Sequence, residues 1–317
     1  MFIVTLFPPT GSNFTASGEF KTTDGKTIEY SKDNLSLSAG NYKRLNVKYI
    51  GAPTTVIERA LTVGDFYYSD GGILPCPQEE GVTVPSEGCI GIIYCTDPNR
   101  IDNDAKQALA TKGVSSAHGL VMALTNASDG CRWGEDGKDE DGLSNTNTLQ
   151  QQYNNISGYA ETQWIIDTYK DSGNTLQDTY AAFYHANNYG KTTETEKYAA
   201  PGTTTGWFIP SMGQWWDILA NLGRIDLGDY KTKSEDFTEI SGAAPTAVNN
   251  MNTYLTKVSG ATQFSATNTT FWSSSECKVY GYGCDACDVA FYNGKLNLGY
   301  ISKSFGSYRE VRCSLAF

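Results

Sequence analysis

The order of strand-forming and helix-forming segments constrains the fold of this chain more than any other feature. Short segments with alternating apolar residues make up the beginning and the end of the chain, whereas helical periodicity occurs in the middle. Elements grouped in this way are typical of α+β proteins, because strictly alternating elements would instead predict a parallel sheet. A chain of this length corresponds to about two domains. We therefore predict an α+β protein, with a β-sandwich portion at residues 1–58 and a second domain at residues 62–317.

The clearest strand signal lies near the C-terminus, where Asn293-Gly294 separates residues 289–292 from residues 295–301. This dipeptide favours a two-residue hairpin turn, so the two flanking segments should pair as antiparallel strands. Other strands are predicted where apolar residues alternate or form short β-branched runs. These are residues 35–37, 45–49, 63–71, 89–95, 118–124, 271–276 and 310–317.

Alternation along this hairpin assigns its side chains to two faces. Val289 and Phe291 should point inward to a core, and Asp288 and Tyr292 should point outward. On the second strand Tyr300 shares its face with two leucines, so alternation alone does not give it an outward position.

The best helix prediction covers residues 211–222. Ser211 and Gln214 have the spacing of a capping box, and Gly223 ends the helix. An apolar face follows the i, i+3, i+4, i+7 rule and consists of Trp215, Ile218, Leu219 and Leu222. We expect a set of large aromatic residues in the core, namely Trp207, Trp215, Trp216 and Trp272. Shorter helical patterns cover residues 162–170, 176–185 and 245–255.

Charge and hydropathy exclude several classes of function. The formal net charge is −11, and no cluster of basic residues is present, so nucleic acid is not an expected partner. No apolar run approaches the roughly 20 residues that span a membrane. Residues 1–7 are too short for a secretion signal and lack a basic start and a cleavage site. We therefore expect an extracellular chain whose signal segment is not part of this sequence.

The eight cysteines suit an oxidising compartment, although the chain is too long for a disulfide-dense scaffold. We expect one or two bridges. Cys76 with either Cys89 or Cys95 is the pairing we favour, and spacing does not fix it.

Two sequence features bear on metal binding. Cys284-Asp-Ala-Cys287, with Cys277 and Cys313 nearby, lacks the second pair at a suitable distance that a zinc site needs. A surface disulfide between two of Cys277, Cys284 and Cys287 is therefore favoured over zinc. The acidic loop at residues 129–142 offers several oxygens to calcium, but it lacks the EF-hand pattern, and a solvated loop is the favoured interpretation. We predict no cofactor and leave calcium as an open alternative.

Several sequence phrases together resemble a known family. Residues 206–215, 271–276, 311–313 and 315–317 resemble C-type lectin-like domains of bacterial adhesins and of variable proteins made by diversity-generating retroelements. Formylglycine-generating enzymes share this fold distantly. Residues 63–71 and 118–124 resemble the lectin-like ends of fimbrillin-type pilins, and the residues before 60 resemble, more loosely, the last strands of a fimbrillin β-sandwich. The resemblance covers roughly residues 62–317. It implies a C-type lectin-like ligand-binding domain preceded by a β-sandwich fragment.

In the retroelement proteins that this chain resembles, the stretch that corresponds to residues 271–317 is variable, and the resemblance places the diversified part at residues 277–308. Randomised adenines in asparagine codons yield Tyr, Ser, Asp, Gly and Cys, among others, but not Lys, Glu, Gln, Met or Trp. The stretch 277–308 contains no Glu, Gln, Met or Trp. Its only lysines are Lys278, Lys295 and Lys303, which we interpret as fixed framework positions.

The chemistry of this stretch independently favours recognition. Tyrosine gives a large contact area at low entropic cost, and Ser, Gly and Asn give adaptable hydrogen bonds, as in antibody paratopes. The predicted ligand-binding residues are Cys277, Tyr280, Tyr282, Asp285, Asp288, Tyr292, Tyr300, Ser302, Ser304, Phe305, Ser307 and Tyr308.

These observations predict a cell-surface adhesin, at a cell surface or pilus tip, that binds a protein or glycan on a host or microbial surface and that other pilus subunits could join. We expect no enzymatic activity, because His118 and His185 are the only histidines and no nucleophile elbow is present. Three alternatives remain: a phage tail-fibre receptor-binding protein, an enzyme of the formylglycine-generating type, and a structural pilus subunit without a ligand.

Overall fold

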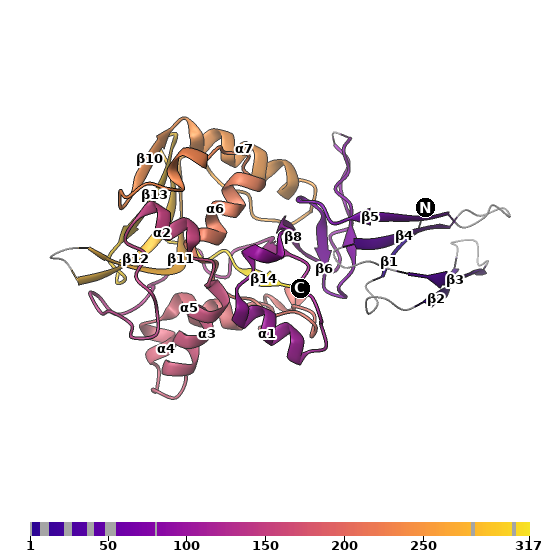
Figure 1. Cartoon of the computed structure of the whole chain (residues 1–317), viewed down its shortest axis with the longest axis horizontal. Helices are drawn as coiled ribbons and strands as arrows, with labels where there is room; N and C mark the ends of the chain where they lie inside the picture. Colours follow the sequence, from indigo (N-terminus) through magenta and orange to yellow (C-terminus); the bar gives the residue numbers. More distant parts are fainter. Residues whose placement is uncertain are drawn as a thin grey trace.

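The computed structural model describes residues 2–6, 13–21, 27–36, 41–47, 55–79, 81–279, 283–305 and 309–317. The first five strands form two small antiparallel sheets. One contains β1 (Phe2–Leu6), β4 (Asn41–Val47) and β5 (Thr55–Ala60), and the other pairs β2 (Phe14–Lys21) with β3 (Thr27–Leu35). Both lie at one end of the molecule (Figure 1). The elements from β6 (Phe66–Tyr68) to β14 (Ser314–Ala316) form a larger unit beside them, which we call the body.

The first sheet of the body has five antiparallel strands. Its strand order is β14-β9-β8-β6-β7, and its strands are β6 (Phe66–Tyr68), β7 (Ile73–Leu74), β8 (Cys89–Cys95), β9 (Leu120–Ala123) and β14 (Ser314–Ala316). Every residue of β8, β9 and β14 is buried, as their continuous apolar sequences predict. The last strand of the chain therefore completes a sheet that the first part of the body begins.

The helices occupy the middle of the chain, between β7 and β11 (Asn268–Val279) in sequence. They are α1 (Asn103–Thr111), α2 (Leu149–Asn154), α3 (Gly158–Tyr169), α4 (Thr175–Asp178), α5 (Ala181–Asn188), α6 (Met212–Asn221) and α7 (Ala243–Leu255), with 3-10 turns at Pro98–Arg100, Glu196–Tyr198 and Gly228–Tyr230. The single helix predicted for residues 176–185 is wrong, because the segment is divided between α4 and α5. The chain turns at Tyr180, and the N–H of Ala182 donates to the carbonyl of Arg132 at 2.9 Å instead of to a helical neighbour.

Helix α6 forms where it was predicted and lies in the core. The capping box is present, and Gln214 Oε1 accepts from the Ser211 N–H at 2.9 Å. The tryptophans predicted for the core are all buried. Two of them link the helix to the second sheet and its neighbouring loop, because the Trp215 indole donates to the Trp272 carbonyl at 3.2 Å and the Trp272 indole donates to the Cys131 carbonyl at 2.8 Å.

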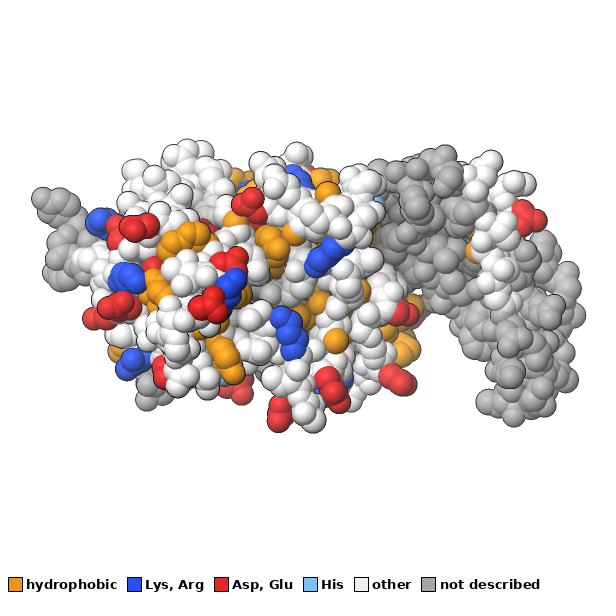
Figure 2. Space-filling view, turned by 90° about the horizontal axis from the view of Figure 1, so that it is seen from below, with side chains coloured by type: hydrophobic (Ala, Val, Ile, Leu, Met, Phe, Trp, Pro, Cys, Tyr) orange, Lys and Arg blue, Asp and Glu red, His pale blue; other side chains and the backbone are white. Residues whose placement is uncertain are grey.

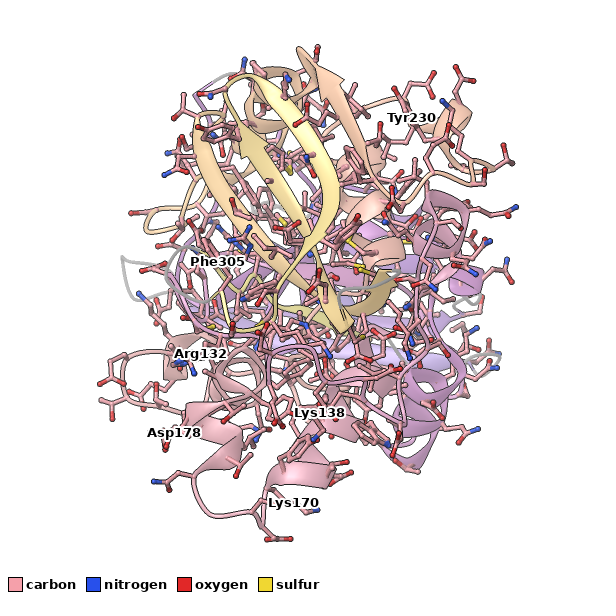
Figure 3. All side chains as sticks on the ribbon, turned by 90° about the vertical axis from the view of Figure 1, so that its left-hand side faces the viewer. Arg132, Lys138, Lys170, Asp178, Tyr230 and Phe305 are labelled. Carbon is pink, nitrogen blue, oxygen red and sulfur yellow. The ribbon has the colours of Figure 1, made fainter. Side chains whose placement is uncertain are left out.

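A second antiparallel sheet of four strands has the order β10-β13-β12-β11. Its strands are β10 (Thr238–Ser241), β11 (Asn268–Val279), β12 (Gly283–Tyr292) and β13 (Lys295–Ile301). This sheet lies at the end of the molecule opposite β1–β5 (Figure 1) and faces the viewer in Figure 3. The observed mixture of helices and antiparallel sheets confirms the α+β class.

Seen from the side of α1 and α4, the surface carries interspersed acidic and basic side chains with small apolar groups between them (Figure 2). None of the described helices is long and apolar enough to cross a membrane.

The predicted bridge from Cys76 to Cys89 or Cys95 is wrong, because both candidate partners are free thiols. Cys89 lies against Tyr68, and the Cys95 thiol donates to the Asp97 carbonyl at 3.8 Å. Both thiols are buried in the sheet, and burial raises the pKa of each to about 12.

Candidate ligand-binding face

The hairpin β12–β13 is the centre of the four-stranded sheet. Its turn residues have positive φ angles, 48° at Asn293 and 77° at Gly294, which confirms the predicted two-residue turn. The register pairs Tyr292 with Lys295 and Ala290 with Asn297. Those four side chains therefore lie on one face of the sheet, because directly opposed residues share a face.

The two faces of the hairpin differ sharply in burial. Val289 and Phe291 are fully buried, as predicted, and the two leucines of β13 are buried with them. On the other face 57% of Tyr292 is exposed, Lys295 is exposed, and Ala290 and Asn297 are half-buried. A side-chain change on the outer face thus leaves the core contacts in place.

The outer face holds a shallow hollow of about 280 Å³. Its walls come from all four strands and from the segment before β14. The lining residues are Glu239, Thr270, Asp288, Ala290, Tyr292, Lys295, Asn297, Tyr300 and Arg309.

Two ion pairs shape this hollow. At its outer edge Lys295 Nζ lies 2.8 Å from Glu239 Oε2, and the lysine lowers the pKa of that carboxyl. At its floor Arg309 Nε lies 2.9 Å from Asp288 Oδ2, and both side chains are largely buried. Burial raises the pKa of Asp288, and Arg309 opposes that shift. The guanidinium of Arg309 also covers the rings of Trp272 and Phe305.

The structure brings three of the predicted residues, Asp288, Tyr292 and Tyr300, together in the hollow. The Tyr300 hydroxyl donates to Asp236 at 3.0 Å, so this tyrosine is held toward the segment before β10. Phe305 is half exposed beside Arg309 and is labelled in Figure 3.

A second group of predicted residues gathers around Asp136 of the acidic loop. Ser302 donates to the Asp136 carboxylate and lies 2.9 Å from the Ser304 hydroxyl. Asp285 is half-buried near the same carboxylate, and its pKa is raised by burial and by Asp136. The predicted residues therefore form two clusters on adjoining parts of the same end of the molecule.

Cys277 does not lie on the exposed face, because it is only 2% exposed. It is in contact with Cys287, and Cys284 donates to the Asn145 side chain at 3.3 Å. All three are free thiols, so the predicted surface disulfide among them is wrong. Tyr280, Tyr282, Ser307 and Tyr308 lie outside the described residues.

Six lining residues were absent from the predicted set: Ala290, Lys295 and Asn297 within residues 277–308, and Glu239, Thr270 and Arg309 outside that stretch. The alternating Thr238-Glu-Ile-Ser241 segment could have indicated a strand. Its pairing with β13, more than fifty residues away along the chain, had no local signal.

One group of side chains has the spacing of a metal site. Ligand atoms of Asp139, Glu276 and Cys284 lie within 4.8 Å of one another. Lys278 lies 2.8 Å from Asp139, and Lys303 contacts Glu276, so both carboxylates already have a cationic partner. Calcium prefers six to eight oxygen ligands, and a thiol does not suit it.

Comparison with known proteins gives a similarity to a fimbrial protein. The chain is 23% identical over 274 residues to "Putative fimbrium tip subunit Fim1C" of Bacteroides ovatus, which covers 76% of this chain and 43% of that protein. The chain therefore spans less than half the length of the curated relative that it matches. No family model matches the chain, and no solved structure matches it.

Proposed function

We propose that this chain is a cell-surface adhesin of a fimbrium, and that the outer face of β10–β13 binds its ligand. In this proposal the body is a C-type lectin-like domain, and β1–β5 belong to a fimbrillin-type β-sandwich. The similarity to a fimbrium tip subunit supports a pilus-related location and association with other pilus subunits. The proposed action is binding, without catalysis or a cofactor.

The observation that carries this proposal is the contrast between the two faces of the β12–β13 hairpin. At the end of β12 the inward residues are fully buried and the outward ones are more open, as Phe291 and Tyr292 show, whereas the outward Asp288 is itself buried against Arg309. The outer residues also surround a hollow with an aromatic ring, an amide and charged groups, a mixture that suits recognition of a protein or a glycan. The face lies opposite β1–β5, so it would remain open if those strands joined the chain to a pilus (Figure 1).

We also propose that residues 277–308 are diversified by a retroelement. Support comes from the three lysines that this process cannot produce from asparagine codons. Each forms an ion pair with an acidic residue: Lys278 with Asp139, Lys295 with Glu239 and Lys303 with Glu276. All three acidic residues lie outside the stretch, and framework positions are expected to make such contacts with constant parts of a fold.

Sequencing the DNA beside the gene tests diversification. We expect a reverse transcriptase and a near-copy of the codons for residues 271–317 that differs only at adenines. A gene without either would leave a fixed binding face and would refute diversification.

Adhesion of beads coated with the full chain tests the binding face. The beads are counted on a panel of epithelial and bacterial cells, with and without protease or glycosidase treatment, which separates protein from glycan ligands. We expect Tyr292→Ala and Lys295→Ala to reduce adhesion about tenfold, since exposed aromatic and charged residues at the centre of an interface dominate its energy.

Lys170→Ala is the matched control. Lys170 is also exposed and pairs with a carboxylate, Asp167, at 2.7 Å, but it lies at the C-terminal end of α3 rather than on the face. Equal adhesion of all variants, with folding intact, would refute the proposed face.

A further inference from the structure

A second cavity lies away from the ligand-binding face. It has a volume of about 630 Å³ and lies between α1, α2, α3 and the loop that contains Gly142. It shares no lining residue with the hollow on the sheet. Its size is within the range of about 300–1,000 Å³ that small-molecule sites occupy.

The lining of this cavity is dominated by uncharged polar side chains. Gln150 and Asn154 on α2 contribute amides, and Ser144 and Ser157 contribute hydroxyls. None of these four side chains forms a hydrogen bond with another residue in the part of the chain that the structure describes. Each amide offers two hydrogen-bond donors and an acceptor, and each hydroxyl can both donate and accept a hydrogen bond. These four side chains therefore suit a ligand rich in hydroxyl groups.

One wall of the cavity is aromatic. The Trp164 indole on α3 packs directly against the backbone at Gly142, so closely that a methyl group at this position would overlap the indole Nε1. The glycine thus permits the ring to sit against the loop. A flat indole of this kind provides apolar area for the C–H face of a sugar ring.

The charged residues of the lining are both acidic. Glu161 is buried and accepts hydrogen bonds from Asn155 at 2.7 Å and from Ser274 at 2.5 Å, while Asp104 is exposed on α1. Among the described residues, no lysine, arginine or histidine lines the cavity. A phosphate or an acidic sugar would therefore meet carboxylates without a compensating cation.

We propose that this cavity binds one or two units of a neutral saccharide, with Trp164 stacking on a sugar ring and the amides of Gln150 and Asn154 bonding its hydroxyl groups. The proposal is independent of the ligand-binding face, because the two sites have different walls. It adds a fixed sugar site to a chain whose sheet residues are proposed to vary.

Tryptophan fluorescence offers a selective readout. All six tryptophans are described, five are buried, and Trp164 is the half-buried one. Quenching by acrylamide therefore reports mainly on Trp164. The full chain is titrated with glucose, galactose, mannose, N-acetylglucosamine, N-acetylgalactosamine, lactose and cellobiose, and with N-acetylneuraminic acid as an anionic comparison.

We expect at least one neutral sugar to protect Trp164 from acrylamide and to give a calorimetric binding signal. The double variant Gln150→Ala/Asn154→Ala, whose side chains are exposed, should weaken that binding about tenfold or more, as loss of ligand hydrogen bonds predicts. Gly142→Ala should weaken it by displacing the indole. Glu194→Gln, at an exposed glutamate that lines neither site, should leave it unchanged.

Absence of binding for every neutral sugar, or unchanged binding in both cavity variants, would overturn the proposal. Tighter binding of N-acetylneuraminic acid would also overturn it. Loss of adhesion in the sheet variants alone bears only on the ligand-binding face, so the two proposals fail separately.

Discussion

Replacing Glu161 by glutamine should change how the stability of the body depends on pH. The carboxylate is buried, and its two hydrogen-bond partners, Asn155 and Ser274, carry no charge. Burial raises the pKa of Glu161 from its usual value of 4.5 to about 7, and the two hydrogen bonds only partly oppose this shift. Glutamine has the same shape, and it can accept from Asn155 and donate to the Ser274 hydroxyl.

The magnitude follows from the difference between the folded and unfolded pKa values. Because the folded pKa lies above the unfolded value, protonation stabilises the folded state. This stabilisation is complete below about pH 4.5 and is lost as the pH rises through about 7. A folded-state pKa that lies roughly two to three pH units above the unfolded value corresponds to about 3 kcal/mol in the free energy of unfolding. The wild-type chain should therefore lose about 3 kcal/mol through this group between about pH 4 and pH 8, and Glu161→Gln should not.

Urea unfolding followed by tryptophan fluorescence measures this effect in the body alone, because every tryptophan lies between residues 133 and 272. Glu194→Gln, at an exposed glutamate, is the control for the same change in net charge. The advantage of Glu161→Gln over the wild type should grow with pH. A pH-independent difference, or one that grows toward low pH, would refute the assignment of Glu161 as a buried carboxyl with a raised pKa.

Three further predictions use the same urea assay. Phe291→Ala should lower the free energy of unfolding by about 3–5 kcal/mol, whereas Tyr292→Ala next to it should lower it by less than about 1 kcal/mol. Equal losses would contradict the assignment of the two faces. Gly294→Ala should cost about 1–2 kcal/mol through its positive φ angle alone, since open space surrounds that position, and an unchanged stability would show that the turn tolerates a side chain. Lys303→Met should cost about 3–5 kcal/mol near neutral pH, because Glu276 would remain buried without its cation, and adding Glu276→Gln should recover most of that loss. The reverse outcome, in which the double variant is no more stable than Lys303→Met, would contradict a charge-based role.

Local patterns were sufficient to predict the elements with strong periodicity. The capping box of α6 and the Asn293-Gly294 turn depend on interactions between residues close in the chain, and both formed as expected. The inward positions of Val289 and Phe291 followed from alternation. The break between α4 and α5 could not be predicted in this way, because it depends on a hydrogen bond from Ala182 to a distant loop.

The candidate site was predictable only in part, because its walls come from segments distant in the sequence. Tyrosine and serine content pointed to β12 and β13, but the pairing of β10 with β13 placed Glu239 in the hollow. Composition also gave no indication that Cys277 is buried, and it lies just after the irregular part of β11. The polar cavity near Trp164 had no sequence signal, since three helices and a loop are needed to form it.

Two display libraries would test the central claim that the outer face of β12–β13 can change its residues without loss of the fold. One library randomises the outer positions Ala290, Tyr292 and Asn297, and the other randomises the buried positions Val289, Phe291 and Leu298. We predict that most members of the first library fold and have the same urea midpoint of unfolding as the parent chain, and that different members bind different cells. Most members of the second library should not fold. A first library that is largely unfolded, or one whose folded members all bind as the parent does, would contradict the account.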